Sequence, residues 1–383
     1  MPGTVLRDRE AEAFPAVTNM ELFFDLVYVF AVTQLSHTLR DHLTGRGALQ
    51  TLVLFGAVWW AWNYTAWATN WIDPGHPRVR GLLVVLMLTS LIMSAAIPEA
   101  FGARAWTFAG AYVALQAARS AFMVWSFGAR DRMARNYAQL LAWSLIAGAV
   151  WLAGAAAHGD TRLALWILAL VLDLAAPMHG FRLPGLGATP MEDWTLRGGH
   201  LAERCQLVLL IAIGESVLAV GSTFSAAHAS FSVVTAFVVG FVLTVSLWWI
   251  YFVRHADAAE RAIAGAAAGA ARIGRAGYAY AHAVMVGGVI VVAVAIDETI
   301  GHPGGTNAAA TTAAILGGPA LYLAGNAIFK RTLSGGWPRS RLLGVAALAV
   351  LVPFGHLVSP LALSAAAALI TLGLAGRESI RTG

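Results

Sequence analysis

Near its N-terminus the chain reads Glu21-Leu-Phe-Phe-Asp25-Leu-Val-Tyr-Val-Phe-Ala-Val-Thr-Gln34-Leu-Ser-His37. The segment is apolar enough to lie in a membrane, yet it opens with two carboxylates. Residues four apart share one face of a helix, so Glu21 and Asp25 point in the same direction. Because a charge that faces lipid is costly, we expect both side chains to face protein, water or a cation.

The composition of the whole chain predicts a membrane protein. Of its 383 residues, 58% are hydrophobic and 12% are charged, and the mean hydropathy is +0.69, whereas soluble domains carry about 25% charged residues. Apolar stretches long enough to cross a hydrocarbon core of about 30 Å recur along the chain. We therefore predict an all-α fold, a polytopic transmembrane helix bundle of about twelve spans. The spans lie near residues 20–38, 48–71, 80–98, 104–126, 138–157, 162–180, 203–222, 231–253, 276–296, 308–330, 341–357 and 359–376.

Basic residues are distributed unevenly between the two sets of loops. If the N-terminus is cytoplasmic, twenty of the 25 Lys and Arg residues fall in loops and tails on that side. The other side holds Arg40, Arg46, Arg104 and Arg162, and Arg119 lies within a span. The positive-inside rule then predicts that both termini are cytoplasmic. Because the basic residues are dispersed, we expect the lipid bilayer as partner and no nucleic acid.

Three landmarks recur in the same order in the two halves of the chain. They are Glu21 and Glu203, then Trp59-Trp60-Ala-Trp62 and Trp248-Trp249-Ile-Tyr251, then Ala-Ile-Pro-Glu99-Ala-Phe-Gly102 and Ala-Ile-Asp-Glu298-Thr-Ile-Gly301. This order predicts a parallel six-plus-six internal duplication, with a cytoplasmic N-terminal tail (1–19), a first repeat (20–200) and a second repeat with a short C-terminal tail (201–383). Chance similarity between apolar segments is the alternative.

Charged residues inside the predicted spans are the candidates for function. Asp25, Arg119, Asp173 and Glu215 are candidate groups for coupling to protons or cations, because intramembrane charges mark ion pathways in many membrane proteins. Glu215 lies about 18 Å along its helix from Glu203. Its carboxyl must be protonated, paired with a cation such as Arg119, or exposed to a wet cavity. A structural lock between helices is the alternative reading of all four.

Other polar and aromatic residues suggest structural or lining roles. His200-Leu-Ala-Glu203-Arg204 lacks the second histidine of a zinc protease helix, so we expect His200, Glu203 and Arg204, with Glu21, to form entry or structural ion pairs. Candidates for lining a cavity are Trp59, Trp60, Trp248, Trp249, His282 and Asn326. The single Cys205 excludes an intrachain disulfide. We expect no metal site and no cofactor, and no motif in the sequence names a reaction.

Two segments resemble the signature of a known family. Those segments are Glu21-Leu-Phe-Phe-Asp25-Leu-Val-Tyr-Val-Phe, and His200-Leu-Ala-Glu203-Arg204 followed by Ile213-Gly214-Glu215-Ser216-Val217-Leu218-Ala219. They are similar to the two signature segments of the bacterial low temperature requirement A (LtrA) family. The resemblance implies a multi-pass protein of the bacterial inner membrane that is linked to growth at low temperature, and it brings no substrate or reaction. Asn19 and Met20 stand where the family usually has an aromatic residue before the first glutamate.

Two functions remain open at this point. In the first, the chain is a secondary transporter or carrier of a small solute or ion, with Asp25 and Glu215 as proton or cation coupling sites. In the second, it is a membrane-embedded enzyme or structural factor that acts on lipid or envelope properties, and its intramembrane charges are interhelical ion-pair locks.

Overall fold

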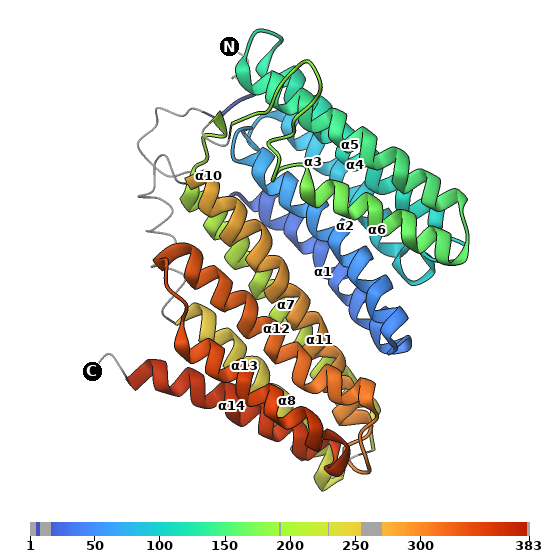
Figure 1. Cartoon of the computed structure of the whole chain (residues 1–383), viewed down its shortest axis with the longest axis vertical. Coiled ribbons are helices and arrows are strands. Elements are labelled where there is room, and N and C mark those ends of the chain that lie inside the picture. The colour runs from blue at the N-terminus through green and yellow to red at the C-terminus, as the bar shows by residue number, and fades with distance from the viewer. Residues whose placement is uncertain (1–4, 8–16, 191–192, 229, 254–269, 381–383) are drawn as a thin grey trace. The chain divides into compact units, whose positions relative to one another are not determined.

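The computed structural model is built from helices over the residues that it describes, which are 5–7, 17–190, 193–228, 230–253 and 270–380 (Figure 1). Among these residues there is no β-strand, and bridge pairing is limited to Leu6 with Ile72 and Leu183 with Gly187. Most of the predicted N-terminal tail, 1–19, lies outside the described residues. The predicted all-α fold class is confirmed.

Each of the twelve predicted spans coincides with a helix or a run of helices in the described part of the chain. In the first half they are α1 (Asn19–Asp41), α2 (Gly45–Thr69), α3 (Pro77–Ala95), α4 (Ala105–Phe127), α5 (Arg132–Ala156) and α6 (Gly159–Ala175). In the second half, four spans are single helices: α7 (Gly198–Ala226), α8 (Phe231–Phe252), α12 (Ala309–Ser334) and α14 (Pro360–Ile380). The ninth span is a continuous run of α10 (Ala270–Ile273), the π-helix η3 (Gly274–Ala281) and α11 (His282–Gly301). The eleventh is a run of α13 (Arg339–Leu351) and the 3-10 helix η4 (Val352–Leu357). Nine helices of the described part are long and apolar enough to cross a membrane; α2, α4 and α6 are not among them, and α6 has 17 residues.

Capping residues explain where several helices begin and end. The side chain of Asp131 accepts the backbone N–H of Met133 at 2.7 Å, so α5 begins at Arg132, six residues before the predicted start at 138. Such a cap satisfies an N–H group that the first turn leaves unpaired. Helix α12 ends at Gly335, whose φ of 75° lies in the left-handed region that glycine tolerates because it has no Cβ.

The described helices fall into two compact units. Unit 1 comprises Met1–Leu35, Leu49–Arg204 and Ala266–Arg272. Within it, α3 packs on α4, α4 on α5 and α5 on α6, as the cyan and green ribbons of Figure 1 show. Its core is aromatic: the rings of Phe108, Tyr112, Trp151 and Trp166 have centroids 5.2–6.2 Å apart.

Unit 2 comprises Ser36–Ala48, Cys205–Gly265 and Ile273–Gly383. Within it, α11 packs on α12, α12 on α13 and α14, and α8 on α14. A Cβ added at Gly288 would lie 2.5 Å from the backbone N of Tyr322, and one at Gly318 would lie 2.8 Å from the backbone N of Val292. Helices α11 and α12 therefore approach so closely that only glycine fits at these crossing points, as small residues allow in membrane helices.

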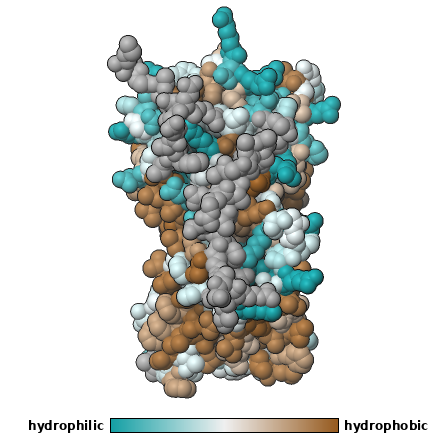
Figure 2. Space-filling model, turned by 90° about the vertical axis from the view of Figure 1, so that its left-hand side faces the viewer, coloured by the Kyte–Doolittle hydropathy of each residue, from teal (hydrophilic) through white to brown (hydrophobic). Residues whose placement is uncertain are grey.

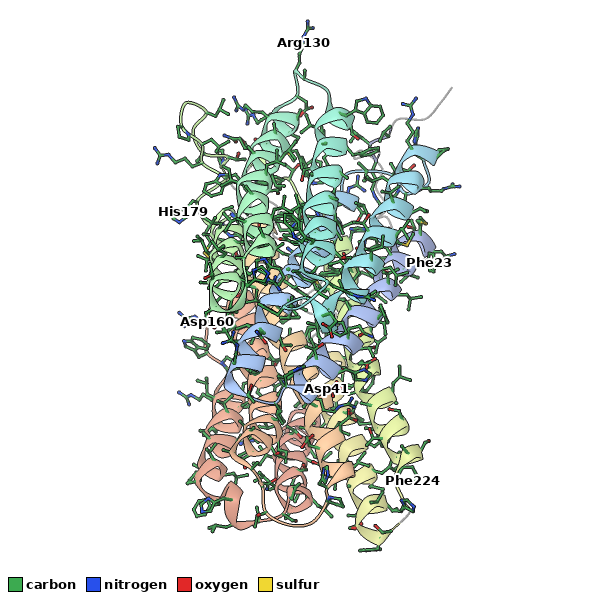
Figure 3. The ribbon with its side chains drawn as sticks, turned by 90° about the vertical axis from the view of Figure 1, so that its right-hand side faces the viewer. Phe23, Asp41, Arg130, Asp160, His179 and Phe224 are labelled. Atoms are coloured by element: carbon green, nitrogen blue, oxygen red, sulfur yellow. The ribbon has the colours of Figure 1, made fainter. Side chains whose placement is uncertain are left out.

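Large apolar side chains are exposed on many helices of the described chain. Phe23 is 58% exposed, and Figure 3 shows it pointing outward from α1. Figure 2 shows hydrophobic residues over wide areas of the visible surface. Exposed apolar patches of this extent are typical of surfaces that face lipid.

Candidate functional site

Glu21 lies in the first turn of α1 and forms a capping box with Thr18. Oε2 of Glu21 accepts two hydrogen bonds from Thr18, one from its backbone N–H at 3.0 Å and one from its hydroxyl at 2.9 Å. In return, the Thr18 hydroxyl oxygen accepts the backbone N–H of Glu21 at 3.3 Å. The reciprocal bonds satisfy N–H groups of the first turn. The carboxylate is fully buried and also accepts from Arg7 at 3.1 Å and from Arg204 at 3.2 Å. Glu21 is therefore both a helix cap and an ion-pair partner.

Arg7 reaches Glu21 because the N-terminal segment docks beside the end of α2. The backbone N–H of Arg7 donates to the Trp71 carbonyl at 2.8 Å, and its Nε donates to the carbonyls of Thr69 and Ile72 at 2.9 and 3.1 Å. The Arg7 side chain is only 7% exposed. The charge count along the sequence treated Arg7 as one more tail charge, whereas it belongs to the buried cluster.

The hydrogen bonds around His200 assign the position of its ring proton. Asn70 accepts the backbone N–H of Arg197 at 2.8 Å and donates to the Arg197 carbonyl at 2.9 Å, which fixes the orientation of its amide. The Asn70 NH2 group therefore faces Nδ1 of His200 at 3.3 Å, and Nδ1 must be an acceptor. The proton then lies on Nε2, which donates to Glu21 at 2.8 Å. Nε2 therefore does not accept from the Arg7 NH2 group, which lies farther away at 3.4 Å. In this arrangement the imidazole is neutral.

Asp25 is held by Arg204 through two contacts. Nε of Arg204 donates to Oδ2 at 2.8 Å, and its NH2 group donates to Oδ1 at 2.6 Å. Trp62 donates a third bond to Oδ1 at 2.7 Å. The remaining NH1 group of Arg204 contacts Glu21 and the Thr69 hydroxyl, the latter at 2.9 Å. Arg204 thus joins both carboxylates of α1 in the forked geometry that guanidinium favours.

The charges of this cluster balance among the residues that the structure describes. Glu21 and Asp25 contribute two negative charges, Arg7 and Arg204 two positive charges, and the hydrogen-bond pattern leaves His200 neutral. Glu21, Asp25 and Arg204 are fully buried and His200 is 1% exposed. A buried network in which every charge is paired is typical of a structural lock.

A second group of polar side chains in unit 1 contains Asp173. Its Oδ2 accepts the hydroxyl of Tyr112 at 2.7 Å and Nε1 of Trp151 at 3.0 Å. Asp173 is 4% exposed, and within the described residues no cation lies within ion-pair distance of it. Its carboxylate is held by neutral donors only.

A directional chain of hydrogen bonds joins Asp173 to Arg119. Arg119 donates to Oε1 of Gln116, Nε2 of Gln116 donates to the Tyr112 oxygen at 2.8 Å, and Tyr112 donates to Asp173. Tyr112, Gln116 and Arg119 stand at i, i+4 and i+7, so they share one face of α4. All are at most 1% exposed. Each donor in the chain polarises the next toward the carboxylate.

Arg119 has unused hydrogen-bonding capacity. No carboxylate of the described chain lies within 4.0 Å of it, and its Nε has no hydrogen-bond partner among the described residues. Its guanidinium lies 5.1 Å from the ring centroid of Tyr64, and Tyr28, Tyr112 and Tyr137 are close enough to interact with its charge. Arg119 and Asp173 are thus opposite charges that two neutral side chains hold apart.

Unit 2 has polar contacts of its own. Nδ1 of His282 lies 2.9 Å from the Gly277 carbonyl and so carries the proton, which leaves Nε2 to accept the hydroxyl of Tyr251 at 2.8 Å. His282 directly follows the π-helix η3, an irregularity that is frequent at functional sites. Asn326 accepts Nε of the fully buried Arg341 at 2.7 Å.

The structure brings some of the predicted residues together and leaves others apart. Glu21, Asp25, His200 and Arg204 form one network, and Arg119 and Asp173 form another. Glu203 is half-buried and accepts the Val17 backbone N–H at 3.1 Å. Glu215 is buried in the part of α7 that belongs to unit 2, whereas Asp25 belongs to unit 1, so their pairing stays a prediction.

The paired tryptophans differ between the two halves. Trp59 and Trp60 are 4% and 1% exposed, but Trp248 and Trp249 are 36% and 40% exposed. The rings of Trp248 and Trp249 are thus partly exposed in the described chain, whereas those of Trp59 and Trp60 are buried. A cavity-lining role stays a prediction for all four.

Several residues of these networks were not singled out from the sequence. Thr18 stands three residues before the candidate Glu21, which is the capping-box spacing. Tyr112 and Gln116 stand at helical spacing from the candidate Arg119, so both sets left a readable signal. No sequence pattern pointed to Trp62 or Arg7, because tryptophans are common in membrane spans and arginines are common in cytoplasmic tails. Arg341 was counted with the cytoplasmic charges, and the structure buries it.

No group of three or more His, Cys, Asp or Glu side chains that could hold a metal ion occurs in the described part of the chain. Cys205 is buried, and its thiol contacts the backbone carbonyl of Tyr278, 3.7 Å away.

The fold and these buried charge networks define a multi-pass helical membrane protein. The family described as bacterial low temperature requirement A protein (LtrA) matches residues 16–376, and the chain belongs to this family. An uncharacterised protein of Rhizobium meliloti (strain 1021) is 36% identical over 380 residues, which cover 97% of this chain and 90% of that protein. No solved structure matches the chain.

Proposed function

We propose that this protein is a secondary carrier of the bacterial inner membrane, in which Asp173 couples the movement of a small solute or ion to that of a proton or cation. We also infer from the distribution of basic residues that both termini are cytoplasmic. The family name links its members to low temperature, and we extend that link to this chain. Membership in the family supports the membrane setting, and the separation of Asp173 from Arg119 supports the coupling role.

That separation is the observation on which the proposal depends. A lock stabilises a buried carboxylate by direct contact with its cation, as Arg204 does for Asp25 at 2.6 Å. Asp173 and Arg119 are buried in the same bundle, yet Tyr112 and Gln116 lie between them. Buried charges without a direct partner are costly, which is why they mark ion and proton pathways when membrane proteins retain them.

Asp25 fits a coupling role less well than the sequence suggested. Its carboxylate accepts three bonds, two of them from a guanidinium. A proton or cation would have to displace Arg204, which would leave a second buried charge unpaired. The coupling role therefore passes to Asp173, while Glu215 stays a sequence-based candidate.

Proton flux in proteoliposomes tests the carrier function. The full-length protein is reconstituted with a pH-sensitive dye inside, and gradients of sodium, potassium, chloride and acetate are imposed in turn. We expect at least one gradient to move protons through the wild-type protein and Asp173→Asn to abolish that movement, because an amide cannot take up the proton.

Asp160→Asn is the matched control, since Asp160 is an exposed carboxylate of the same helix α6. This variant should keep the wild-type flux. Wild-type protein that moves no protons under any of the four gradients, or flux that persists in Asp173→Asn, would contradict the proposal.

A structural role is the second candidate, and the balanced cluster around Arg204 favours it. If all intramembrane charges are locks, Asp173→Asn should destabilise the protein as strongly as Asp25→Asn does. Under the carrier proposal Asp173→Asn remains folded with a melting temperature close to that of the wild type, since it removes a charge that has no direct partner.

A further inference from the structure

Arg119 is surrounded by neutral polar and aromatic side chains, several of which carry hydroxyl groups. Four tyrosines, Tyr28, Tyr64, Tyr112 and Tyr137, are close enough to interact with its charge. The hydroxyl of Tyr137 and Nε of Arg119 are buried and have no hydrogen-bond partner among the described residues. The described chain places no carboxylate within ion-pair distance of the guanidinium. An anion-binding site needs a positive charge and free hydrogen-bond donors, and these groups supply both.

The comparison with Arg204 shows what this site lacks. Both guanidiniums are fully buried in unit 1. Arg204 is neutralised by the carboxylates of Glu21 and Asp25, which belong to the chain itself. Arg119 contacts the neutral amide of Gln116 and the carbonyl of Ala61, the latter at 3.5 Å. An anion that does not belong to the chain would complete the Arg119 site as the two carboxylates complete the Arg204 site.

We propose that Arg119 is the binding group for a small monovalent anion, which the carrier moves together with a proton on Asp173. The inference rests on the proposed carrier function and names the class of its substrate. It is monovalent because one guanidinium supplies the charge, and it is small because the guanidinium is enclosed by the side chains of the bundle. A cation is repelled by Arg119 and has no carboxylate there to bind.

The hydrogen-bond chain explains how the anion and the proton are coupled. Without an anion, the positive charge of Arg119 stabilises the ionised carboxylate of Asp173 through Gln116 and Tyr112. An anion that neutralises Arg119 removes this stabilisation, so Asp173 takes up a proton from water. Binding one anion and one proton together adds no net charge to the site, which lowers the free-energy cost of moving the pair through the membrane.

Binding to the purified full-length protein in detergent tests the site directly. Melting temperature is followed while sodium chloride, sodium nitrate or sodium acetate replaces sodium gluconate at constant ionic strength. We expect a saturable rise with at least one small anion in the wild type, because a ligand that binds the native state stabilises it. Arg119→Gln should lose the rise, and Arg132→Gln should keep it, since Arg132 is exposed and lies outside the site.

A second variant keeps the test decisive if Arg119→Gln does not fold. Tyr137→Phe preserves the guanidinium and the ring packing and removes one unused hydroxyl. We expect it to weaken anion binding roughly 2- to 12-fold, the usual effect of one hydrogen bond. Unchanged affinity in folded Tyr137→Phe, or saturable binding that survives in folded Arg119→Gln, would overturn the proposal.

Proton uptake separates this inference from the carrier function. In weakly buffered solution near neutral pH, the wild type should take up as much as one proton per bound anion, and Asp173→Asn should bind the anion without proton uptake. If no small anion binds while a sodium or potassium gradient moves protons in proteoliposomes, the anion inference fails and the carrier function stands. If an anion binds with proton uptake but no gradient drives flux, the site stands and the carrier function fails.

Discussion

At the scale of single residues, Arg204 and Arg119 show two ways of burying a guanidinium. Arg204 is paired with two carboxylates, and its contacts with Asp25 are 2.6 and 2.8 Å long. Among the described residues, Arg119 has no direct hydrogen bond to Asp173, and a chain of hydrogen bonds through Gln116 and Tyr112 links the two. The first arrangement compensates the desolvation of both ions, and the second leaves each ion without a direct partner. The same residue type therefore serves stability at one position and a proposed binding function at the other.

The Asp25–Arg204 pair should contribute strongly to stability. Asp25→Asn removes one of the two carboxylates that pair with the fully buried guanidinium of Arg204 among the described residues, and breaking a buried pair costs about 3–5 kcal/mol. We expect a large drop in melting temperature in detergent. Trp62→Phe removes one neutral hydrogen bond to the same carboxylate and should cost about 0.5–1.5 kcal/mol.

Glu203→Gln is the matched control for this prediction. It lies next to Arg204 on α7, but its carboxylate accepts only a backbone N–H from Val17 among the described contacts. It should change the melting temperature far less than Asp25→Asn does. Equal effects of the two substitutions would show that the Arg204 pair is not a lock.

At the scale of helices, α11 and α12 form the closest packed pair in unit 2. A Cβ at Gly325 would lie 2.8 Å from the backbone N of Met285 and 2.9 Å from the carbonyl O of Ala281. The obstacles at Gly288, Gly318 and Gly325 include backbone atoms, which cannot move aside as a flexible side chain can. The contact therefore depends on glycine at these three positions.

Two neighbouring glycines of α12 should respond oppositely to the same substitution. Gly318→Ala must push α11 and α12 apart, because its Cβ would lie 2.8 Å from the Val292 backbone N, so we expect a lower melting temperature. Gly317 has open space around it, and Gly317→Ala should stabilise the helix by about 0.5–1 kcal/mol, the usual gain from replacing glycine within a helix. If Gly318→Ala were as stable as Gly317→Ala, the close approach would be disproved.

The order of helix packing is similar within the two units. In unit 1, α3, α4, α5 and α6 pack in sequence, and in unit 2, α11, α12, α13 and α14 do the same. The predicted duplication pairs these helices in the same order. Consecutive helices pack together in many bundles, so the duplication stays a prediction that this order supports.

At the scale of the whole molecule, arginines near opposite ends of the membrane-spanning helices have different environments. On the side that we infer to be external, Arg162 is 5% exposed and donates to the carbonyls of Phe101 and Ala157 at 2.6 and 3.0 Å. Arg104 donates to the carbonyl of Ala95 at 3.1 Å. These guanidiniums bind carbonyl groups at helix ends, where the helix dipole favours a cation. Arg130 and Arg132 on the opposite side are exposed, as positive-inside loops require.

Labelling of introduced cysteines tests this orientation. Arg130 lies just before the start of α5, and Asp160 lies in the first turn of α6, just after the end of α5; Figure 3 labels both. With the N-terminus in the cytoplasm, Asp160→Cys should react with a membrane-impermeant maleimide in intact cells, and Arg130→Cys only after permeabilisation. The wild type is the control, because its single Cys205 is buried. The reverse labelling pattern would refute cytoplasmic termini.

The helical membrane class and the places of the twelve apolar segments could be predicted from the sequence. Burial of apolar surface and the need to satisfy backbone N–H and C=O groups within each span act locally, so they leave a pattern that is readable along the chain. The charged and polar residues of the candidate site could also be named from the sequence, because they interrupt apolar segments. They are Glu21, Asp25, His200 and Arg204.

Which charges lie together depends on how the helices pack, and the sequence does not show it. Arg204 and Asp25 are 179 positions apart in the sequence, as are His200 and Glu21. Arg119 and Asp173 come from α4 and α6, and Tyr112 and Gln116 come between them only when those helices pack. Whether a buried charge is locked or held apart from its partner depends on distances of a few ångströms across helices, and no local pattern records them. The carboxylates of Glu21 and Asp25 are thus ion-paired in one cluster, and the group proposed for coupling is Asp173.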